Sequence, residues 1–416
     1  MEKITRLVLS ICLVLGIFSL KAQTFTNYTT SNGMPHLNVN CLAEDAAGNM
    51  WFGTSAGIAK FDGVSNWTYY TTTSHTGLAD NTVTAIAVVA NGDIWAGTDF
   101  GVSVFNGTTF TTYTVAADGL GNDRIKYIAQ AANGDVWLGD FSGATKYSSS
   151  TFTAYGTAAG LPFGGIDYID FDSNDDVYMA NGLFGFIKYD GSTFTTYNTS
   201  NGLVSNNVRS ITVDASDNKW VGTAEGITVF NSTNTVLDTH ATIVAITPPH
   251  VLNPVEDVKI NSQGDVWAGI YVDYLGTEGG VGVNTGGSAW TDYHVADGLV
   301  GPVIRKMHID QSDNVWVATS TGVTKISFPT GVDNTLMAQE KTFSVYPNPT
   351  SNKLTIALSE KNNTDDNIVF YNTTMQMVKQ VKIAAYEQSI TVSLNDLDRG
   401  VYFVKNGTQI AKVIIQ

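Results

Sequence analysis

The stretch Asn91-Gly92-Asp93-Ile94-Trp95-Ala96-Gly97-Thr98 recurs with small changes along most of the chain. Its aromatic residue is the most regular feature, and the copies place it at Trp51, Trp95, Trp137, Tyr178, Trp220, Trp267 and Trp316. Successive anchors are 44, 42, 41, 42, 47 and 49 residues apart. A period in the low forties indicates a repeat architecture, in which each copy is one supersecondary unit.

The copy in residues 77–115 shows what this unit is. Runs rich in β-branched residues alternate with the two-residue turns Asn91-Gly92 and Asn106-Gly107, which tolerate the positive φ that a tight hairpin needs. The expected strands are residues 82–89, 93–97, 101–105 and 109–114. Four antiparallel strands in one period make a propeller blade, so seven copies predict an all-β, seven-bladed β-propeller.

The seventh copy lacks its fourth strand, because the repeat ends after residues 324–328. A match to the missing strand lies near the N-terminus, where Phe25-Thr26-Asn27-Tyr28 resembles Phe110-Thr111-Thr112-Tyr113 of the second copy. We therefore expect the N-terminal strand to pair as the outer strand of the last blade and to close the ring, which covers open strand edges. We interpret the Trp anchors as packing residues, because aromatic rings dominate the cores of stacked sheets.

Bulk composition limits the classes of function. Charged residues are only 14% of the 416 residues and the net charge is −16, which argues against binding nucleic acid or anionic lipid through bulk charge. Residues 1–22 combine Lys3 and Arg6 with an apolar run and predict a signal peptide. No other stretch is apolar and long enough to span a membrane. The mature chain would keep Cys41 alone and form no internal disulfide.

The pattern Gly-Leu, a Val/Ile strand and Asp-x-x-Gly-x-Trp-x-Gly-Thr resembles the two-component regulator propeller repeat over residues 24–328. The Gly-Leu pairs stand at residues 77–78, 119–120, 160–161, 202–203 and 298–299. In that family the repeats usually form the periplasmic sensor of hybrid histidine kinases of Bacteroidetes, often for glycans. This chain departs from that plan, because its sequence shows neither a membrane helix nor a kinase.

Two spacings exceed the period, and both insertions flank Trp267. One lies in residues 238–254 and the other in residues 270–279. A loop between strands two and three opens on the same face as the loop that enters the next blade, so both insertions project from one face. Insertions confined to one face often mark the binding face of a repeat protein. The candidate ligand-facing residues are His240, His250, Tyr271, Asp273, Tyr274 and Glu278.

The sequence predicts no catalytic residue, metal site or cofactor. The histidines are dispersed around the predicted ring without the short spacing of a metal or acid–base cluster. Asp-rich turns such as residues 172–176 lack the ordered ligand spacing of a calcium loop, and hairpin turns account for them.

The C-terminal part loses the repeat. Residues 329–341 are interpreted as a linker, and residues 342–416 contain several short strands that predict a small Ig-like β-sandwich. Tyr346-Pro347-Asn348-Pro349, Gly400-Val401-Tyr402-Phe403-Val404 and the closing Lys412-Val413-Ile414-Ile415 resemble the type A sorting domain of the type IX secretion system. This resemblance implies Sec export through the periplasm, passage across the outer membrane by the type IX machinery, and surface attachment or release.

We therefore expect an exported, cell-surface or secreted propeller that occupies residues 23–328 and binds a ligand, such as a glycan, on the face with the insertions. One alternative is a secreted polysaccharide lyase or hydrolase with its site at the mouth of the central channel, since propellers host both roles. Another is a structural or adhesive protein.

Overall fold

The computed structural model describes residues 23–246, 252–272, 278–328, 343–358, 366–372, 376–406 and 409–416. The chain divides into two compact units, Met1–Pro329 and Thr330–Gln416. The described residues are almost entirely strands and turns, so the predicted all-β class is confirmed. No helix among them has the length and apolarity that a membrane span requires. The predicted signal peptide, residues 1–22, lies outside the described residues.

The first unit consists of seven four-stranded antiparallel sheets in its described residues. Six of them take four consecutive strands: β2–β5 (Val39–Glu44, Met50–Thr54, Gly57–Phe61, Trp67–Tyr70), β6–β9 (Ala85–Val88, Ile94–Thr98, Gly101–Phe105, Phe110–Tyr113), β10–β13 (Ile125–Gln130, Val136–Asp140, Ala144–Ser148, Thr151–Tyr155), β14–β17 (Ile166–Phe171, Val177–Asn181, Gly185–Tyr189, Phe194–Tyr197), β18–β21 (Val208–Val213, Lys219–Thr223, Gly226–Phe230, Val236–His240) and β22–β25 (Val255–Ile260, Val266–Tyr271, Gly279–Asn284, Thr291–Tyr293).

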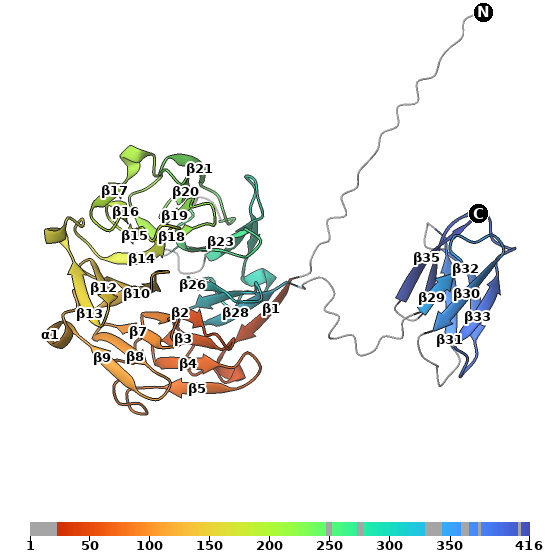
Figure 1. Cartoon of the computed structure of the whole chain (residues 1–416), viewed down its shortest axis with the longest axis horizontal. Coiled ribbons are helices and arrows are strands. Elements are labelled where there is room, and N and C mark those ends of the chain that lie inside the picture. The colour runs from red at the N-terminus through yellow and green to blue at the C-terminus, as the bar shows by residue number, and fades with distance from the viewer. Residues whose placement is uncertain are drawn as a thin grey trace, which may run out of the picture. The chain divides into compact units, whose positions relative to one another are not determined.

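Short helices lie in the connections that lead from one sheet to the next. They are η1 (Thr30–Asn32), α1 (Val115–Asp118), η2 (Thr157–Ala159), η3 (Thr199–Asn201) and η4 (Val295–Asp297). In Figure 1 the sheets are arranged around a centre, with β2, β10, β14, β18 and β26 toward the middle and β5, β9, β13, β17 and β21 toward the rim. The first strand of each sheet therefore faces the central channel.

The seventh sheet joins the two ends of the repeat region. It contains β26 (Ile304–Ile309), β27 (Val315–Thr319), β28 (Gly322–Ser327) and, as its outer strand, β1 (Thr24–Tyr28), which pairs antiparallel with β28. Figure 1 shows β1 beside β28. The side chain of Glu44 accepts a hydrogen bond from the backbone N–H of Gln311 at 2.8 Å, which ties the seventh sheet to the first.

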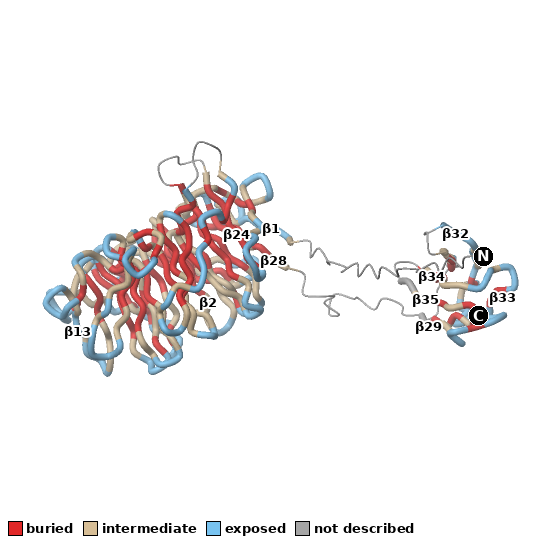
Figure 2. The backbone as a smooth tube through the Cα atoms, turned by 90° about the horizontal axis from the view of Figure 1, so that it is seen from above, coloured by how far each residue is buried: buried red, intermediate tan, exposed pale blue. Residues whose placement is uncertain are grey.

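The core of this unit lies between neighbouring sheets. Figure 2 shows that the strands are mostly buried and that the loops that connect them are mostly exposed. Trp95 packs with Leu120, Ile125 and Val136 of the following repeat. A Cβ added to Gly97 would come within 2.6 Å of Ile125 Cγ2, so only glycine lets the next sheet approach this closely. The repeated Trp-x-Gly element is therefore a packing joint, as predicted.

Six of the seven first strands carry a register shift directly after their first residue. The residues that the shifts leave unpaired are Asn40, Lys126, Asp167, Arg209, Glu256 and Arg305. A β-bulge of this kind turns a side chain out of the regular alternation of the strand. In β6 the equivalent position, Thr84, precedes the strand. The sequence predicted this strand over residues 82–89, whereas β6 covers only Ala85–Val88. Residues 82–84 and residue 89 belong to the connections on either side of it.

The second unit has two antiparallel sheets around one core, which gives the predicted small β-sandwich. One sheet contains β29 (Phe343–Tyr346), β30 (Lys353–Leu358) and β33 (Ser389–Ser393); the other contains β31 (Asp366–Tyr371), β32 (Met377–Ile383), β34 (Gly400–Asn406) and β35 (Gln409–Ile415). Leu354, Ile356, Ile368, Phe370 and Val404 are fully buried in this core.

Candidate functional site

The bulged residues of the first strands gather at the mouth of the central channel. Arg209, Glu256 and Arg305 line a hollow of about 550 Å³ together with Asn40, Thr84 and Lys306. An adjoining hollow adds Lys126 and Asp167 to the same wall. A cavity of this size suits a small ligand or one part of a larger ligand. Six bulged residues and Thr84, which holds the equivalent position in the second sheet, thus place polar side chains around the mouth.

Two ion pairs organise this ring, and each joins neighbouring sheets. The ammonium group of Lys126 in β10 contacts the carboxylate of Asp167 in β14. The guanidinium group of Arg209 in β18 contacts the carboxylate of Glu256 in β22. The next cation, Arg305 of β26, has a buried Nε without a hydrogen-bond partner. The mouth therefore contains two ion pairs and one buried N–H donor, Arg305 Nε, that has no acceptor.

Further along the first strands, two tyrosines and two lysines narrow the channel. The rings of Tyr127 and Tyr168 stack with their centres 4.1 Å apart. Lys306 Nζ lies 4.5 Å from the centre of the Tyr168 ring and 5.5 Å from that of Tyr127, in cation–π contact. Lys259 donates a hydrogen bond to the Tyr168 hydroxyl. The stacked rings thus form a floor on which a lysine ammonium group rests.

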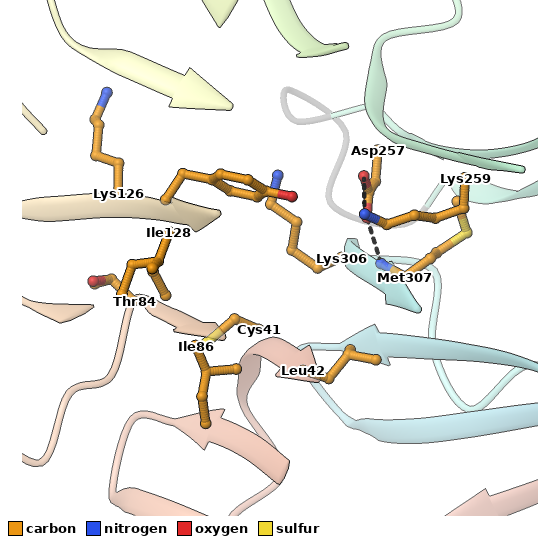
Figure 3. A pocket seen from close by; sticks show the side chains of 12 residues that line it. Cys41, Leu42, Thr84, Ile86, Lys126, Ile128, Asp257, Lys259, Lys306 and Met307 are labelled. Carbon is orange, nitrogen blue, oxygen red and sulfur yellow. Dashed lines mark hydrogen bonds and ion pairs between the residues drawn. The ribbon is translucent and has the colours of Figure 1, made fainter. Parts of the chain in front are cut away.

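The two lysines have different electrostatic surroundings. Burial alone would lower the pKa of Lys259, but the carboxylate of Asp257 and other neighbouring groups outweigh it and raise this pKa. Lys259 Nζ lies 3.9 Å from Asp257 Oδ1, and Figure 3 shows these two side chains turned toward each other beside Lys306. For Lys306, burial prevails and lowers the pKa, with only partial compensation by Asp257. Lys306 is therefore the weakly compensated cation of the channel.

Of the six candidate residues named from the sequence, Tyr271 lies at the mouth. It ends β23 and lines the same hollow as Arg209 and Arg305. Glu278 lines a separate hollow with Ala245, His294 and Pro302. His250, Asp273 and Tyr274 lie outside the described residues.

His240 has a packing position instead. The residue is 7% exposed, and its ring stacks on Trp220 with a centre distance of 5.6 Å and an interplanar angle of 9°. The Trp290 ring meets His240 in a T-shaped arrangement, with ring centres 5.5 Å apart. Burial lowers the pKa of His240, and the charge of Asp238 offsets this only in part. We leave His240 out of the site, because the two indoles cover its ring.

Our sequence reasoning missed a set of exposed apolar residues on the face that carries the mouth. We call it the apolar arc, and its members are Phe100, Phe141, Phe163, Leu183 and Phe184. Four of them stand in loops between the second and third strands of three consecutive sheets, and Phe163 lies in the connection that leads into β14. These loops lie at the start of the first strands, because Ile125 pairs with Asp140 and Ile166 with Asn181.

The members of the arc lie on adjacent loops. Arg124 joins the first two loops, because its Nε contacts Asp99 at 3.2 Å and its guanidinium carbon lies 4.0 Å from the centre of the Phe141 ring. Lys126 Nζ lies 4.8 Å from that ring centre and also lines the mouth. The arc therefore reaches the charged ring through Lys126.

Asn181 holds the last part of the arc in place. It is fully buried, and its Nδ2 donates to the carbonyl oxygens of Phe163 and Gly165 at 3.4 and 3.3 Å. Its Oδ1 accepts from the backbone N–H groups of Leu183 and Phe184 at 2.9 and 3.0 Å. Four other sheets have threonine at this position: Thr54, Thr98, Thr223 and Thr319. The Asn181 side chain thus contacts the backbone of both loops.

A signal for the arc was present in the sequence. The loops between strands two and three read Ser55-Ala56, Ala224-Glu225 and Ser320-Thr321 in three sheets outside the arc, and none of these six residues is a large apolar one. In the arc they contain Asp99-Phe100, Phe141-Ser142 and Leu183-Phe184. An alignment of the repeats by their Trp anchors would have separated these two groups. In the residues that the structure describes, no three His, Cys, Asp or Glu side chains are grouped as a metal ion would require.

Two family models match the chain. Residues 33–56 and 77–100 match the two component regulator propeller, and residues 344–416 match the secretion system C-terminal sorting domain. A comparison with curated proteins gave no match.

Solved propellers share the fold at low sequence identity. The extracellular domain of the hybrid two component system BT3049 from B. thetaiotaomicron has a TM-score of 0.61 and 15% identity, over 94% of this chain and 57% of that one. PorZ, a surface component of the type-IX secretion system of Porphyromonas gingivalis, has a TM-score of 0.59 and 16% identity, over 91% and 59%. A streptogramin B lyase has a TM-score of 0.59 and 15% identity, over 74% and 98%.

The chain thus spans less than two thirds of the length of the BT3049 and PorZ structures. Identities this low show the fold alone. The repeat matches, the seven sheets and the matched tail agree with one another. The chain thus combines a propeller, in which two segments match the two component regulator propeller, with a tail that matches the secretion system C-terminal sorting domain.

Proposed function

We propose that this protein is an exported ligand-binding propeller that displays the mouth and the apolar arc on one face. The sorting domain indicates delivery to the cell surface or release, and we propose that the chain reaches the type IX machinery by Sec export through the periplasm. The ligand class that we propose is a glycan. Flat aromatic rings beside hydrogen-bonding groups suit a sugar, which has apolar ring faces and polar edges.

The observation that carries this proposal is the exposed arc beside the charged mouth. Phe163 is 72% exposed and Phe100 is 63% exposed, although both occur in short loops of a tightly packed propeller. Clustered exposed apolar side chains on a soluble protein commonly mark a binding surface. Lys126 links the arc to the mouth, so an extended ligand could contact both.

One observation favours a second candidate, an enzyme that acts on polysaccharides. Lys306 has a pKa lowered by burial and lies over two tyrosines at the channel. A lysine with a lowered pKa beside tyrosines has the chemistry of a general acid–base pair. Turnover of a polysaccharide that stops in a Lys306→Met variant would favour this candidate over simple binding.

The experiment that tests binding is a glycan array probed with the exported chain, including its sorting domain. We expect wild-type protein to bind a defined set of glycans and a Phe141→Ala, Phe163→Ala double variant to lose most of this signal. Val64→Ser is the matched control, because Val64 is 82% exposed and stands in a hairpin between β4 and β5 on the opposite face. Binding that survives the double variant would place the site away from the arc.

Export can be tested separately. A chain truncated before residue 342 retains the propeller and loses the matched sorting region. We expect such a chain to accumulate in the periplasm of a type IX-competent host, whereas the full chain reaches the surface or medium. Equal surface delivery of both chains would contradict the proposed route.

A further inference from the structure

Four cations and two carboxylates line one wall of the mouth, in a chain with a net charge of −16. Lys126 and Arg209 contact the two carboxylates, Asp167 and Glu256. In the part of the chain that the structure describes, Arg305 and Lys306 have no carboxylate at ion-pair distance and no side-chain hydrogen bond. Two adjacent cations are therefore left without an anionic partner inside the hollow.

The nearby acidic groups already have other contacts. Asp257 Oδ2 accepts a hydrogen bond from the backbone N–H of Met307 at 2.6 Å, and its Oδ1 lies 3.9 Å from Lys259 Nζ. The other polar side chains around the pair are amide, hydroxyl and phenol groups: Asn40, Thr84, Tyr127, Tyr168 and Tyr271. The surrounding protein thus provides aromatic faces and neutral side chains where a charge partner would be expected.

This arrangement has an energetic cost when the mouth is empty. Two like charges on neighbouring residues repel each other, and partial burial removes part of the water that would screen them. The lowered pKa of Lys306 is one consequence of this burial. The unpartnered, buried Nε of Arg305 is another unsatisfied group in the same wall. A single oxyanion bound between them would satisfy both cations.

We propose that Arg305 and Lys306 form an anion subsite at the channel mouth, which takes a carboxylate, sulfate or phosphate group of the ligand. The planar guanidinium group provides paired donors for two oxygens, while the ammonium group provides a point charge. The proposal rests on the ligand-binding function proposed above and narrows the ligand to one that carries an oxyanion. Tyr271, at the edge of the same hollow, is placed to contact the uncharged part of such a ligand.

The test is isothermal titration of the exported chain with galacturonate, sulfate and phosphate, each at an ionic strength matched with chloride. We expect at least one of these anions to bind at one site per chain, and the preferred anion identifies the group. Arg305→Gln and Lys306→Gln should each weaken that binding about tenfold or more, as loss of a charged hydrogen bond does. Arg124→Gln is the control, since it removes one positive charge on the same face, where Arg124 pairs with Asp99.

A second measurement separates a ligand role from a structural one. In chloride buffer, Lys306→Met should unfold at the same temperature as wild type or higher, because a partly buried charge that has no anionic partner is removed while the side chain still packs on the two tyrosine rings. Added anion should raise the unfolding temperature of wild type but not of this variant. Equal weakening by Arg124→Gln, or absence of saturable binding by all three anions, would overturn the subsite. If the chain binds one of these anions but binds no glycan on the array, the anion subsite stands and the proposed glycan ligand is contradicted.

Discussion

The indole Nε1 of Trp316 donates a hydrogen bond to the carboxylate Oδ2 of Asp310 at 2.8 Å, six residues back along the chain. The same pair forms between Trp51 and Asp45 at 2.9 Å and between Trp220 and Asp214 at 3.3 Å. Tyr178 contacts Asp172 in the same way, at 3.2 Å. In these four repeats the aspartate six residues before the aromatic anchor therefore joins the hairpin turn to the ring that packs between sheets.

Three repeats lack this bond, because their equivalent positions hold Val89, Ala131 and Asn261. In one of them the consequence is visible, since the buried Nε1 of Trp267 has no hydrogen-bond partner. The sheets thus share one topology but differ in whether the buried indole N–H has a hydrogen-bond acceptor. We therefore expect equivalent substitutions in different sheets to change the free energy of unfolding by different amounts.

Asp310→Ala should destabilise the propeller by about 1–3 kcal/mol, because it leaves the buried Trp316 donor without a partner. Chemical unfolding followed by tryptophan fluorescence measures this, since all eight tryptophans lie within the propeller. Asn261→Ala is the control, because Asn261 accepts equivalent turn hydrogen bonds without binding its indole. If both variants lose the same free energy of unfolding, the loss comes from the hydrogen bonds of the turn and not from the bond to the indole.

The stabilisation by Asp310 should depend on pH. Burial opposes ionisation, but hydrogen bonds from Trp316 and Asn314 outweigh it and hold the pKa of Asp310 below its usual value. A carboxylate with a lowered folded-state pKa stabilises fully above its unfolded pKa, near 3.9, and loses this contribution as pH falls through the folded value. The stability gap between wild type and Asp310→Asn should be constant from pH 7 to about pH 5 and narrow below about pH 4. A stability difference between wild type and Asp310→Asn that grows as the pH falls would contradict a lowered pKa of Asp310 in the folded state.

Removal of residues 23–28 should lower the unfolding temperature by about 10 °C, because a whole outer strand and two ring contacts are lost. Tyr28 stacks on Trp316 with ring centres 5.4 Å apart, and Phe25 meets Tyr293 edge-on at 5.6 Å. Differential scanning calorimetry measures the shift. Tyr28→Phe, which keeps the ring, should remain close to wild type, and an unchanged curve for the truncated chain would show that β1 does not hold the ring together.

Asn181→Thr should release the loops of the apolar arc while the sheet stays folded. Threonine is the residue of four other sheets at this position, but it cannot reach both the Phe163 and Gly165 carbonyls. We expect faster amide hydrogen exchange at Phe184, whose N–H group loses its acceptor. The N–H of Leu183 keeps an acceptor, because a threonine hydroxyl at this position accepts from the residue two places on, as Thr54 does from Ala56. Exchange mass spectrometry should show no change in the loop at residues 55–56, and an unchanged exchange rate at Phe184 would contradict the role of Asn181.

Much of the fold followed from local patterns. The Asn91-Gly92 turn with its alternating strands predicted the four-stranded unit, and the spacing of the Trp anchors predicted how often it recurs. The pairing of residues 25–28 with β28 could also be inferred, because one repeat lacked a strand that another region supplied. Such features are predictable since hairpins and their registers depend on neighbours along the chain.

The site was less predictable. The insertions pointed to Tyr271, which lines the mouth, but the same reasoning included His240, whose ring packs against Trp220 and Trp290. Arg305 and Lys306 look ordinary in sequence, as two charged residues at the start of one more strand. Their importance depends on which cations find carboxylates across sheets about 40 residues apart.

The sequence by itself determined the repeating unit, the joint between Trp95, Gly97 and the following sheet, and the presence of a sorting domain. These follow from short-range periodicity, hairpin chemistry and a motif of adjacent residues. Only the tertiary structure decided which bulged side chains meet at the channel, which of their charges are compensated, and that Phe100, Phe141 and Phe163 share one face. Ring closure brings together residues from distant repeats, and charge compensation depends on those distances in space.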